Sequence, residues 1–219
     1  MSVTPFKAQI QYPDSDGKPM ADNTIQYDWM VKLKENIDFL LRDDPQVFVA
    51  ANLLWYPVEG RPDLRRAPDV MVAFGRAKGH RGSYRQWEEG GIAPQVVIEV
   101  LSPGNTPGEM ASKLRFYDQY GVEEYCQVDP APESLSVSSW QRQGEGLVIS
   151  AEEDRWQSPR LGITIAVKEA QLIALHPDGK PFLSAQELYA KYAEQQEQIQ
   201  DQQDEIARLR AELDRLRGQ

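Results

Sequence analysis

The sequence predicts a mixed α/β domain followed by a long C-terminal helix. Between residues 47 and 128, apolar runs typical of strands alternate with polar loops and one well-capped helical segment. The tail is different, because from Leu188 onward there is no glycine or proline until Gly218. A chain of 219 residues, 41% of them hydrophobic, is long enough for one compact domain with a core and an appendage.

The first expected segment is an irregular arm over residues 1–23, which are rich in proline, aspartate, glycine and serine. A folded domain over residues 24–184 and a C-terminal helix over residues 185–219 would follow. The domain would begin with a helix to about Leu41, because apolar residues recur there three or four positions apart. The sequence Asp43-Asp44-Pro45 would end this helix.

Strands are expected next at residues 47–50, 53–56 and 69–74, with a long polar loop over residues 75–91. The clearest strand is residues 95–101. Apolar residues alternate there, so Val96, Ile98 and Val100 would share one face and Val97, Glu99 and Leu101 the other.

A helix is expected after this strand. Thr106 is a suitable N-cap, Pro107 occupies the first helical position, and Gly121 would end the helix. Residues 124–128 predict another strand, and residues 135–175 predict several short strands separated by turns.

The C-terminal tail carries a heptad pattern. Apolar residues recur every seven positions in two series. The first series is Tyr192, Ile199, Ile206 and Leu213. The second is Leu188, Gln195, Gln202, Leu209 and Leu216, in which two glutamines replace apolar residues. The pattern predicts a coiled coil that makes the protein a homodimer, and a solvated single helix is the alternative.

Composition restricts the class of protein. The net charge of −10 argues against generic DNA binding, which neutralises phosphates with Lys and Arg, although a local basic groove can coexist with an acidic surface. The single cysteine excludes an internal disulfide framework, and the two histidines lie too far apart in sequence to indicate zinc chemistry. With no apolar run long enough to cross a membrane and no signal segment, we expect a cytoplasmic protein.

Two carboxylates and a lysine are the strongest functional signal. Asp69 begins one apolar run, Glu99 lies inside another, and Lys113 follows on the expected helix. Two buried acids repel each other unless a divalent cation lies between them. Asp69, Glu99 and the carbonyl oxygen of Val100 would offer the hard oxygen ligands that Mg²⁺ prefers. The ion would activate water for phosphodiester hydrolysis, and Lys113 would orient the nucleophile or bind the scissile phosphate.

Each of these three residues also has a purely structural explanation. Asp69 follows a proline and could cap a turn. Glu99 could face solvent from an edge strand, and Lys113 could be a solvated helix residue.

Two further residues could support the site. Glu109 completes the capping-box sequence TPGE and also lies one helical turn before Lys113, and we favour capping over metal binding. Ser102 ends the strand that carries Glu99, but a serine before proline is most simply a turn residue.

The polar loop contains the best candidates for nucleic-acid contact. Four fixed positive charges lie within ten residues of this acidic chain: Arg76, Lys78, Arg81 and Arg85. We expect them to contact the phosphate backbone, and a merely solvated loop is the alternative.

Four motifs together resemble a known family. They are APDV at residues 67–70, VIEVLSPGNT at residues 97–106, Lys113 with Tyr117, and GVEEY at residues 121–125. Over roughly residues 25–180 the chain resembles the Uma-type putative restriction endonucleases, a branch of the PD-(D/E)XK nuclease superfamily. The resemblance implies a restriction-endonuclease-like fold, in which a mixed central sheet is flanked by helices, and a magnesium-dependent site.

The resemblance also implies roles for single residues. Asp69 and Glu99 match the metal-binding acids. The superfamily lysine normally stands two residues after the second acid, where this chain has Leu101, and Lys113 on the following helix would replace it. Glu35 is a candidate for the further acid that many members contribute from a helix.

These observations lead to one main hypothesis and two alternatives. The main hypothesis is a DNA endonuclease that uses Mg²⁺, with Mn²⁺ as a substitute, and that dimerises through its tail so that two sites cut two strands. The first alternative is a catalytically inactive nuclease-fold module that binds DNA or protein through its coiled coil. The second is a metal-dependent hydrolase of a small phosphoester.

Overall fold

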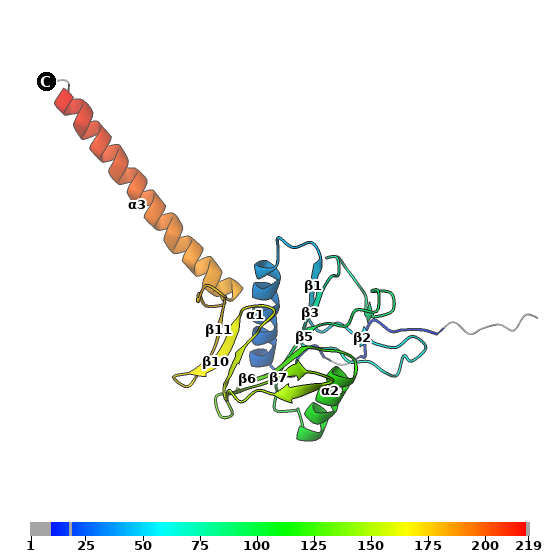
Figure 1. The fold of residues 1–219 in the computed structure, drawn as a ribbon. Coiled ribbons are helices and arrows are strands. Elements are labelled where there is room, and N and C mark those ends of the chain that lie inside the picture. Colours follow the sequence, from blue (N-terminus) through cyan, green and yellow to red (C-terminus); the bar gives the residue numbers. More distant parts are fainter. Residues whose placement is uncertain (1–9, 18, 218–219) are drawn as a thin grey trace, which may run out of the picture. The chain divides into compact units, whose positions relative to one another are not determined.

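The computed structural model describes residues 10–17 and 19–217 (Figure 1). Within the expected arm, residues 10–17 and 19–23 form no helix or strand, while residues 1–9 and 18 lie outside the described residues. The last two residues of the expected tail, 218 and 219, also lie outside them. The chain divides into two compact units, one ending at Phe182 and the other beginning at Leu183.

A six-stranded mixed sheet forms the centre of the first unit, in the order β1-β3-β5-β6-β7-β8. Neighbouring strands are antiparallel except β5 and β6, which are parallel and are connected by helix α2 (Pro107–Gln119). The strand bounds are β1 Val47–Ala50, β3 Val70–Phe74, β5 Val96–Val100, β6 Glu124–Asp129, β7 Ser136–Gln143 and β8 Gly146–Ile149. The mixed sheet with flanking helices confirms the predicted fold class.

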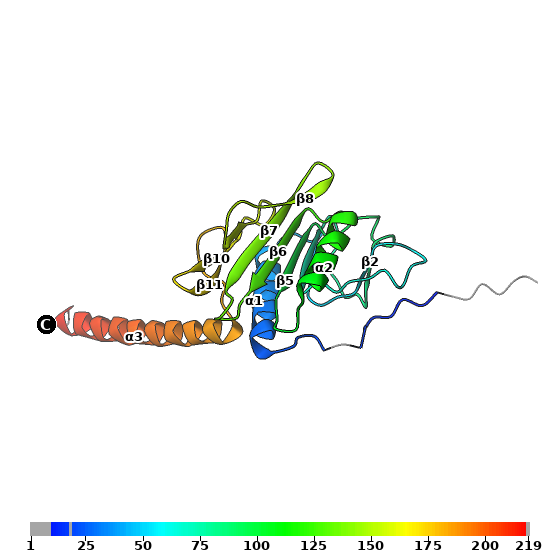
Figure 2. The ribbon, with the colours of Figure 1, turned by 90° about the horizontal axis from the view of Figure 1, so that it is seen from below.

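Helices α1 (Thr24–Leu40) and α2 cover opposite faces of this sheet (Figure 2). The alternation predicted for β5 is present. Val96, Ile98 and Val100 pack in one apolar cluster with residues of α1, whereas Val97 packs in a second cluster with residues of α2. Because successive side chains of a strand point to opposite faces, Glu99 lies on the face that α2 covers.

Both helices begin at polar caps. The Asn23 side chain accepts a hydrogen bond from the backbone N–H of Gln26 at the start of α1. At the start of α2, Thr106 accepts from the N–H of Glu109, and Pro107 is the first helical residue, as predicted. Beyond the C-terminus of α2, Gly121 has a φ of +94°, a conformation that glycine adopts without strain.

One pair of short strands differs from the prediction. Strand β2 comprises only Trp55–Tyr56, and it pairs in parallel with β4 (Tyr84–Arg85), which lies inside the segment predicted to be a polar loop. The aromatic residues of these two strands are fully buried. Their burial against α2 and the sheet, which local sequence does not reveal, explains this pairing.

A second, three-stranded sheet completes the first unit, in the order β11-β10-β9. Its strands are β9 Arg155–Gln157, β10 Thr164–Lys168 and β11 Gln171–Leu175. Trp156, Ile163 and Ile165 from this region join the apolar cluster on the α1 side. The short strands predicted for residues 135–175 are therefore present.

The second unit contains helix α3 (Ala185–Arg217), 33 residues long and without a buried residue. In the part of the chain that the structure describes, no helix is both long and apolar enough to cross a membrane.

Candidate active site

The register of β3 against β5 brings Asp69 and Glu99 together. Val70 pairs with Ile98 in this antiparallel ladder, so extending the ladder by one residue places Asp69 opposite Glu99. The Asp69 carboxylate accepts a hydrogen bond of 2.8 Å from the backbone N–H of Val100. Asp69 therefore bonds to the neighbouring strand instead of capping a turn, and it is buried, with 7% of its surface exposed.

Glu99 is the most deeply buried acid of the site, with 1% of its surface exposed on a strand flanked by β3 and β6. Two side chains one helical turn apart on α2 reach it. The Lys113 ammonium donates to Oε2 at 2.9 Å, and the Tyr117 hydroxyl donates to Oε1. Neither an edge strand for Glu99 nor a solvated Lys113 agrees with this geometry.

Burial and charge set the protonation of this cluster. Burial raises the pKa of the Asp69 carboxyl well above its usual range, and the charge of Glu99 raises it further. A hydrogen bond between the two carboxyls acts in the same direction. Burial lowers the pKa of Lys113, but the charge and hydrogen bond of Glu99 outweigh that effect, and the net shift is upward. Lys113 is therefore a cation at neutral pH.

The donor set at this point suits Mg²⁺. Asp69 and Glu99 offer carboxylate oxygens, and the Val100 carbonyl, held by a 2.8 Å hydrogen bond from the Gln26 amide, keeps a second lone pair. Within residues 10–17 and 19–217, no group of three or more His, Cys, Asp or Glu side chains could hold a metal ion. Two carboxylates and one carbonyl would leave the remaining coordination positions to water, and Mg²⁺ usually keeps several water ligands in proteins.

A cavity of about 730 Å³ opens beside Asp69 and Lys113. Its walls come from the arm, the start of α1, the segment before β3, and the first turns of α2. The charged residues that line it are Asp16, Asp22, Asp63, Arg65, Arg66, Asp69, Glu109 and Lys113. The space is therefore large enough for part of a substrate beside the acid pair and carries charges of both signs.

The supporting residues are placed as follows. Glu109 is exposed and lines the cavity, and its backbone N–H donates to the Thr106 hydroxyl at 3.2 Å. This bond is the Thr106 cap and does not involve the Glu109 side chain, so the preference for capping over metal binding stays a prediction. The Ser102 hydroxyl donates to Asp22 at 2.6 Å, which ties the arm to the end of β5. Glu35, 64% exposed at its side chain, pairs with Lys34 and does not line the cavity.

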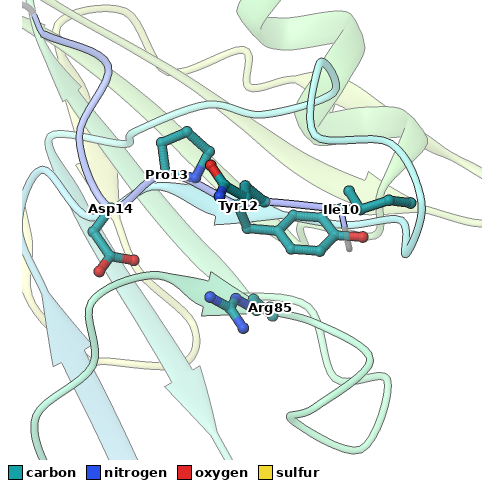
Figure 3. Close-up of a pocket in the computed structure, with 6 residues that line it drawn as sticks. Ile10, Tyr12, Pro13, Asp14 and Arg85 are labelled. Atoms are coloured by element: carbon teal, nitrogen blue, oxygen red, sulfur yellow. The ribbon is translucent and has the colours of Figure 1, made fainter. Parts of the chain in front are cut away.

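The structure does not bring the four loop cations into the cavity. Arg81 pairs with Glu89 at 2.6 Å, Arg76 lies 3.7 Å from the same carboxylate, and Lys78 pairs with Asp38 at 3.3 Å. Arg85 pairs with Glu88 and lines a separate pocket along the arm. Figure 3 shows its guanidinium close to the Tyr12 ring. A phosphate would have to compete with these carboxylates.

Sequence reasoning missed two arginines that do line the cavity. Arg65 and Arg66 directly precede the APDV motif, a position that could have drawn attention to them. Arg66 donates to the Ser112 hydroxyl at 3.1 Å and lies over the Phe116 ring, 5.3 Å from its centre. Among the ion pairs found in the described residues, none involves either arginine.

Comparison with known proteins gives a family match. The model of the Uma2 family, described as "Putative restriction endonuclease", matches residues 19–168. Among solved structures, the chain is similar to "a putative nuclease belonging to DUF820" from Anabaena variabilis, at 16% sequence identity and a TM-score of 0.47. That alignment covers 68% of this chain and 81% of the other. Among curated proteins, none matches the chain.

Proposed function

The chain belongs to the Uma2 family, described as "Putative restriction endonuclease", and we propose that it is a magnesium-dependent DNA endonuclease. Membership of this family supports a nuclease function. The observation that carries the finer proposal is the convergence of two buried carboxyls, Asp69 and Glu99, with the ammonium group of Lys113. When both acids are ionised, the two negative charges face the single positive charge of Lys113. A divalent metal ion would supply the missing positive charge.

Asp69, Glu99 and the Val100 carbonyl would hold the ion. When bound, Mg²⁺ would supply Lewis-acid activation of the phosphate and lower the pKa of a bound water. Mn²⁺ accepts the same oxygen ligands and would replace it. Gln26 supports this arrangement by fixing the direction of the Val100 carbonyl.

The chain's own residues would then position the reacting groups. Lys113 is charged at neutral pH and stands at the edge of the cavity, where its ammonium would bind an oxygen of the scissile phosphate or orient the attacking water. Tyr117 has a pKa raised well above its usual value by burial and by the charge of Glu99, so it remains a neutral donor. Its hydrogen bond would hold the Glu99 carboxylate in one orientation.

The substrate proposal rests on phosphate recognition. Arg65 and Arg66 line the same cavity as Asp69, so a DNA strand in this cavity would have two guanidinium groups available for its phosphates. Arg76, Lys78, Arg81 and Arg85 stay a prediction for contacts farther along the duplex. The net charge of −10 makes such local basic positions necessary for any DNA complex.

A specific observation favours the inactive nuclease-fold module as a second candidate. Lys113 donates to Glu99, and the position two residues after the acid, which carries the lysine in many superfamily members, is Leu101. If Lys113 does nothing except neutralise Glu99, the chain would bind DNA or protein without cutting. This alternative predicts metal binding without turnover.

Two further parts of the proposal concern assembly and location. The exposed apolar positions of α3 support a homodimer through this helix, which would bring two catalytic sites to one duplex. The buried, unpaired thiol of Cys126 is consistent with the reducing conditions of the cytoplasm, where we place the activity.

The test is cleavage of supercoiled plasmid DNA in Mg²⁺, in Mn²⁺ and in EDTA. Wild type would be compared with Asp69→Asn, Glu99→Gln and a matched surface control, Asp43→Asn, whose side chain is 85% exposed. Circular dichroism of each variant would verify that it is folded.

We expect metal-dependent nicking or linearisation by wild type and the control, and none by the two site variants. Absence of cleavage by a folded, metal-binding wild type would favour the inactive module. Turnover of a small phosphodiester without plasmid cleavage would favour the phosphoester hydrolase. Equal cleavage by the site variants would reject the assigned acids.

A further inference from the structure

Helix α3 presents an apolar seam that no described part of the chain buries. Seven heptad residues on this helix are between 45% and 64% exposed: Leu188, Tyr192, Ile199, Ile206, Leu209, Leu213 and Leu216. With Tyr192 and Ile199 at position a of the heptad, the leucines at 188, 209 and 216 occupy position d. A helix with such a seam buries it against another helix.

We propose that the occupant of this seam is α3 of a second copy, arranged in parallel and in register as a two-stranded coiled coil. The core positions favour this geometry. Ile206 at position a is followed by Leu209 at position d, the combination typical of parallel two-stranded coils, whereas Ile199 lies between Gln195 and Gln202.

The two glutamines of the seam discriminate between orientations. In a parallel, in-register pair, Gln195 and Gln202 each face the same residue of the second copy, so the two amides can donate to and accept from each other. In the fully overlapping antiparallel pair, Gln202 would face Ile199 and Gln195 would face Ile206. A buried amide beside isoleucine loses its hydrogen-bonding partner, which is costly. The glutamines therefore disfavour the antiparallel arrangement.

The charges that flank the seam point to the same orientation. Glu205 and Glu212 occupy position g, and Arg210 and Arg217 occupy position e. In a parallel pair, position g of one helix lies beside the following position e of the other. Glu205 would pair with Arg210 of the second copy, and Glu212 with Arg217 of the second copy, twice each by symmetry. The fully overlapping antiparallel pair gives neither arginine an acid across the interface.

The orientation has a consequence for the proposed nuclease. The first unit ends at Phe182, three residues before α3 begins at Ala185, so a parallel coil attaches both nuclease units at the same end. An antiparallel coil would attach them at opposite ends of a helix about 50 Å long. The parallel arrangement therefore gives two sites a high effective concentration on one duplex. This consequence rests on the proposed function, whereas the coil itself does not.

The first experiment is cysteine cross-linking of the full chain. Leu209→Cys places a thiol at position d, where a parallel, in-register pair brings the two copies of residue 209 together. We expect mild oxidation to yield a covalent dimer that dithiothreitol reverses. The matched control is Asp204→Cys at the outward position f, and wild type controls for the buried Cys126. A dimeric Leu209→Cys protein that forms no disulfide would overturn the parallel register, and a monomer in light scattering would overturn the coil.

The second experiment exchanges charges. One variant carries Glu205→Arg and Glu212→Arg, and the other carries Arg210→Glu and Arg217→Glu. In a homodimer of either variant, the flanking positions that face each other carry charges of the same sign. We expect each to self-associate roughly tenfold more weakly than wild type and the mixture to form heterodimers preferentially. A statistical mixture with unchanged affinities would refute the pairing. Both readouts report association alone, so they remain decisive even if the chain cuts no DNA.

Discussion

Removing the cation beside Glu99 tests the electrostatic account of the site. In Lys113→Met, the charged side chain is replaced by a neutral one of similar length, and the Glu99 carboxylate loses the one ion pair that it forms within the described residues. Glu99 is 1% exposed, so water cannot replace the lost partner. Tyr117 still donates a hydrogen bond, which compensates in part.

The expected cost follows from burial. Removing one partner of a buried ion pair typically costs about 3–5 kcal/mol. We expect the lower end, about 3 kcal/mol, because Lys113 keeps 16% of its side chain exposed and Tyr117 remains. For a domain of this size, about 3 kcal/mol corresponds to a fall in Tm of roughly 6–12 °C.

The assay is thermal and urea denaturation in EDTA, with Lys180→Met as the matched control. Lys180 also pairs with an acid, Asp178 at 2.7 Å, but its side chain is 79% exposed, so its loss should change stability far less than the loss of Lys113.

Mg²⁺ should stabilise Lys113→Met more than wild type, because the ion then replaces the missing positive charge. If Lys113→Met unfolds at the same urea concentration as Lys180→Met, the buried pair does not carry the stability assigned to it. If added Mg²⁺ affects wild type and Lys113→Met equally, the ion does not bind where Lys113 compensates the acids.

Two other predictions concern the acid and the arginines of the cavity. In EDTA, the free energy of unfolding should fall as pH rises above about 4, because folded Asp69, with its raised pKa, keeps a proton that the unfolded chain releases. Asp69→Asn should reduce this slope in urea titrations between pH 4 and 8, and an unchanged slope would contradict the assignment. Arg65→Gln with Arg66→Gln should weaken binding of a labelled duplex, measured by anisotropy in EDTA, and reduce the magnitude of the negative slope of log K against log salt by about 1.8. The matched pair Arg76→Gln with Lys78→Gln should change that slope less, since both cations already face carboxylates, and equal effects would argue against the cavity arginines.

Local patterns in the sequence were sufficient for the elements that carry the site. The alternation over residues 95–101 predicted the face on which Glu99 lies, because side chains of a strand alternate whatever the strand packs against. Thr106 and Pro107 predicted the start of α2 through hydrogen bonds and backbone angles that involve only neighbouring residues. The heptad pattern of α3 is equally local, and it covers a described helix of 33 residues.

Other features depended on contacts between distant segments. The polar appearance of residues 75–91 concealed strand β4, which forms because Tyr84 is buried against partners elsewhere in the chain. The four loop cations were expected to be available to phosphate, yet their pairing with carboxylates depends on how the loop folds back on itself and on α1. Arg65 and Arg66 looked unremarkable until the cavity was formed by the arm and α2 around them.

By itself, the sequence determined the periodicity of this protein: the helices and strands that carry the site, the face of β5 that holds Glu99, and the positions of α3 that form a seam. Only the tertiary structure decided which charged groups meet. The register of β3 on β5 sets Asp69 opposite Glu99, and the crossover of α2 brings Lys113 and Tyr117 to the same carboxylate. The physical reason is that backbone geometry and capping act over a few residues, whereas the pairing of buried charges depends on chain segments that only the packed core brings together.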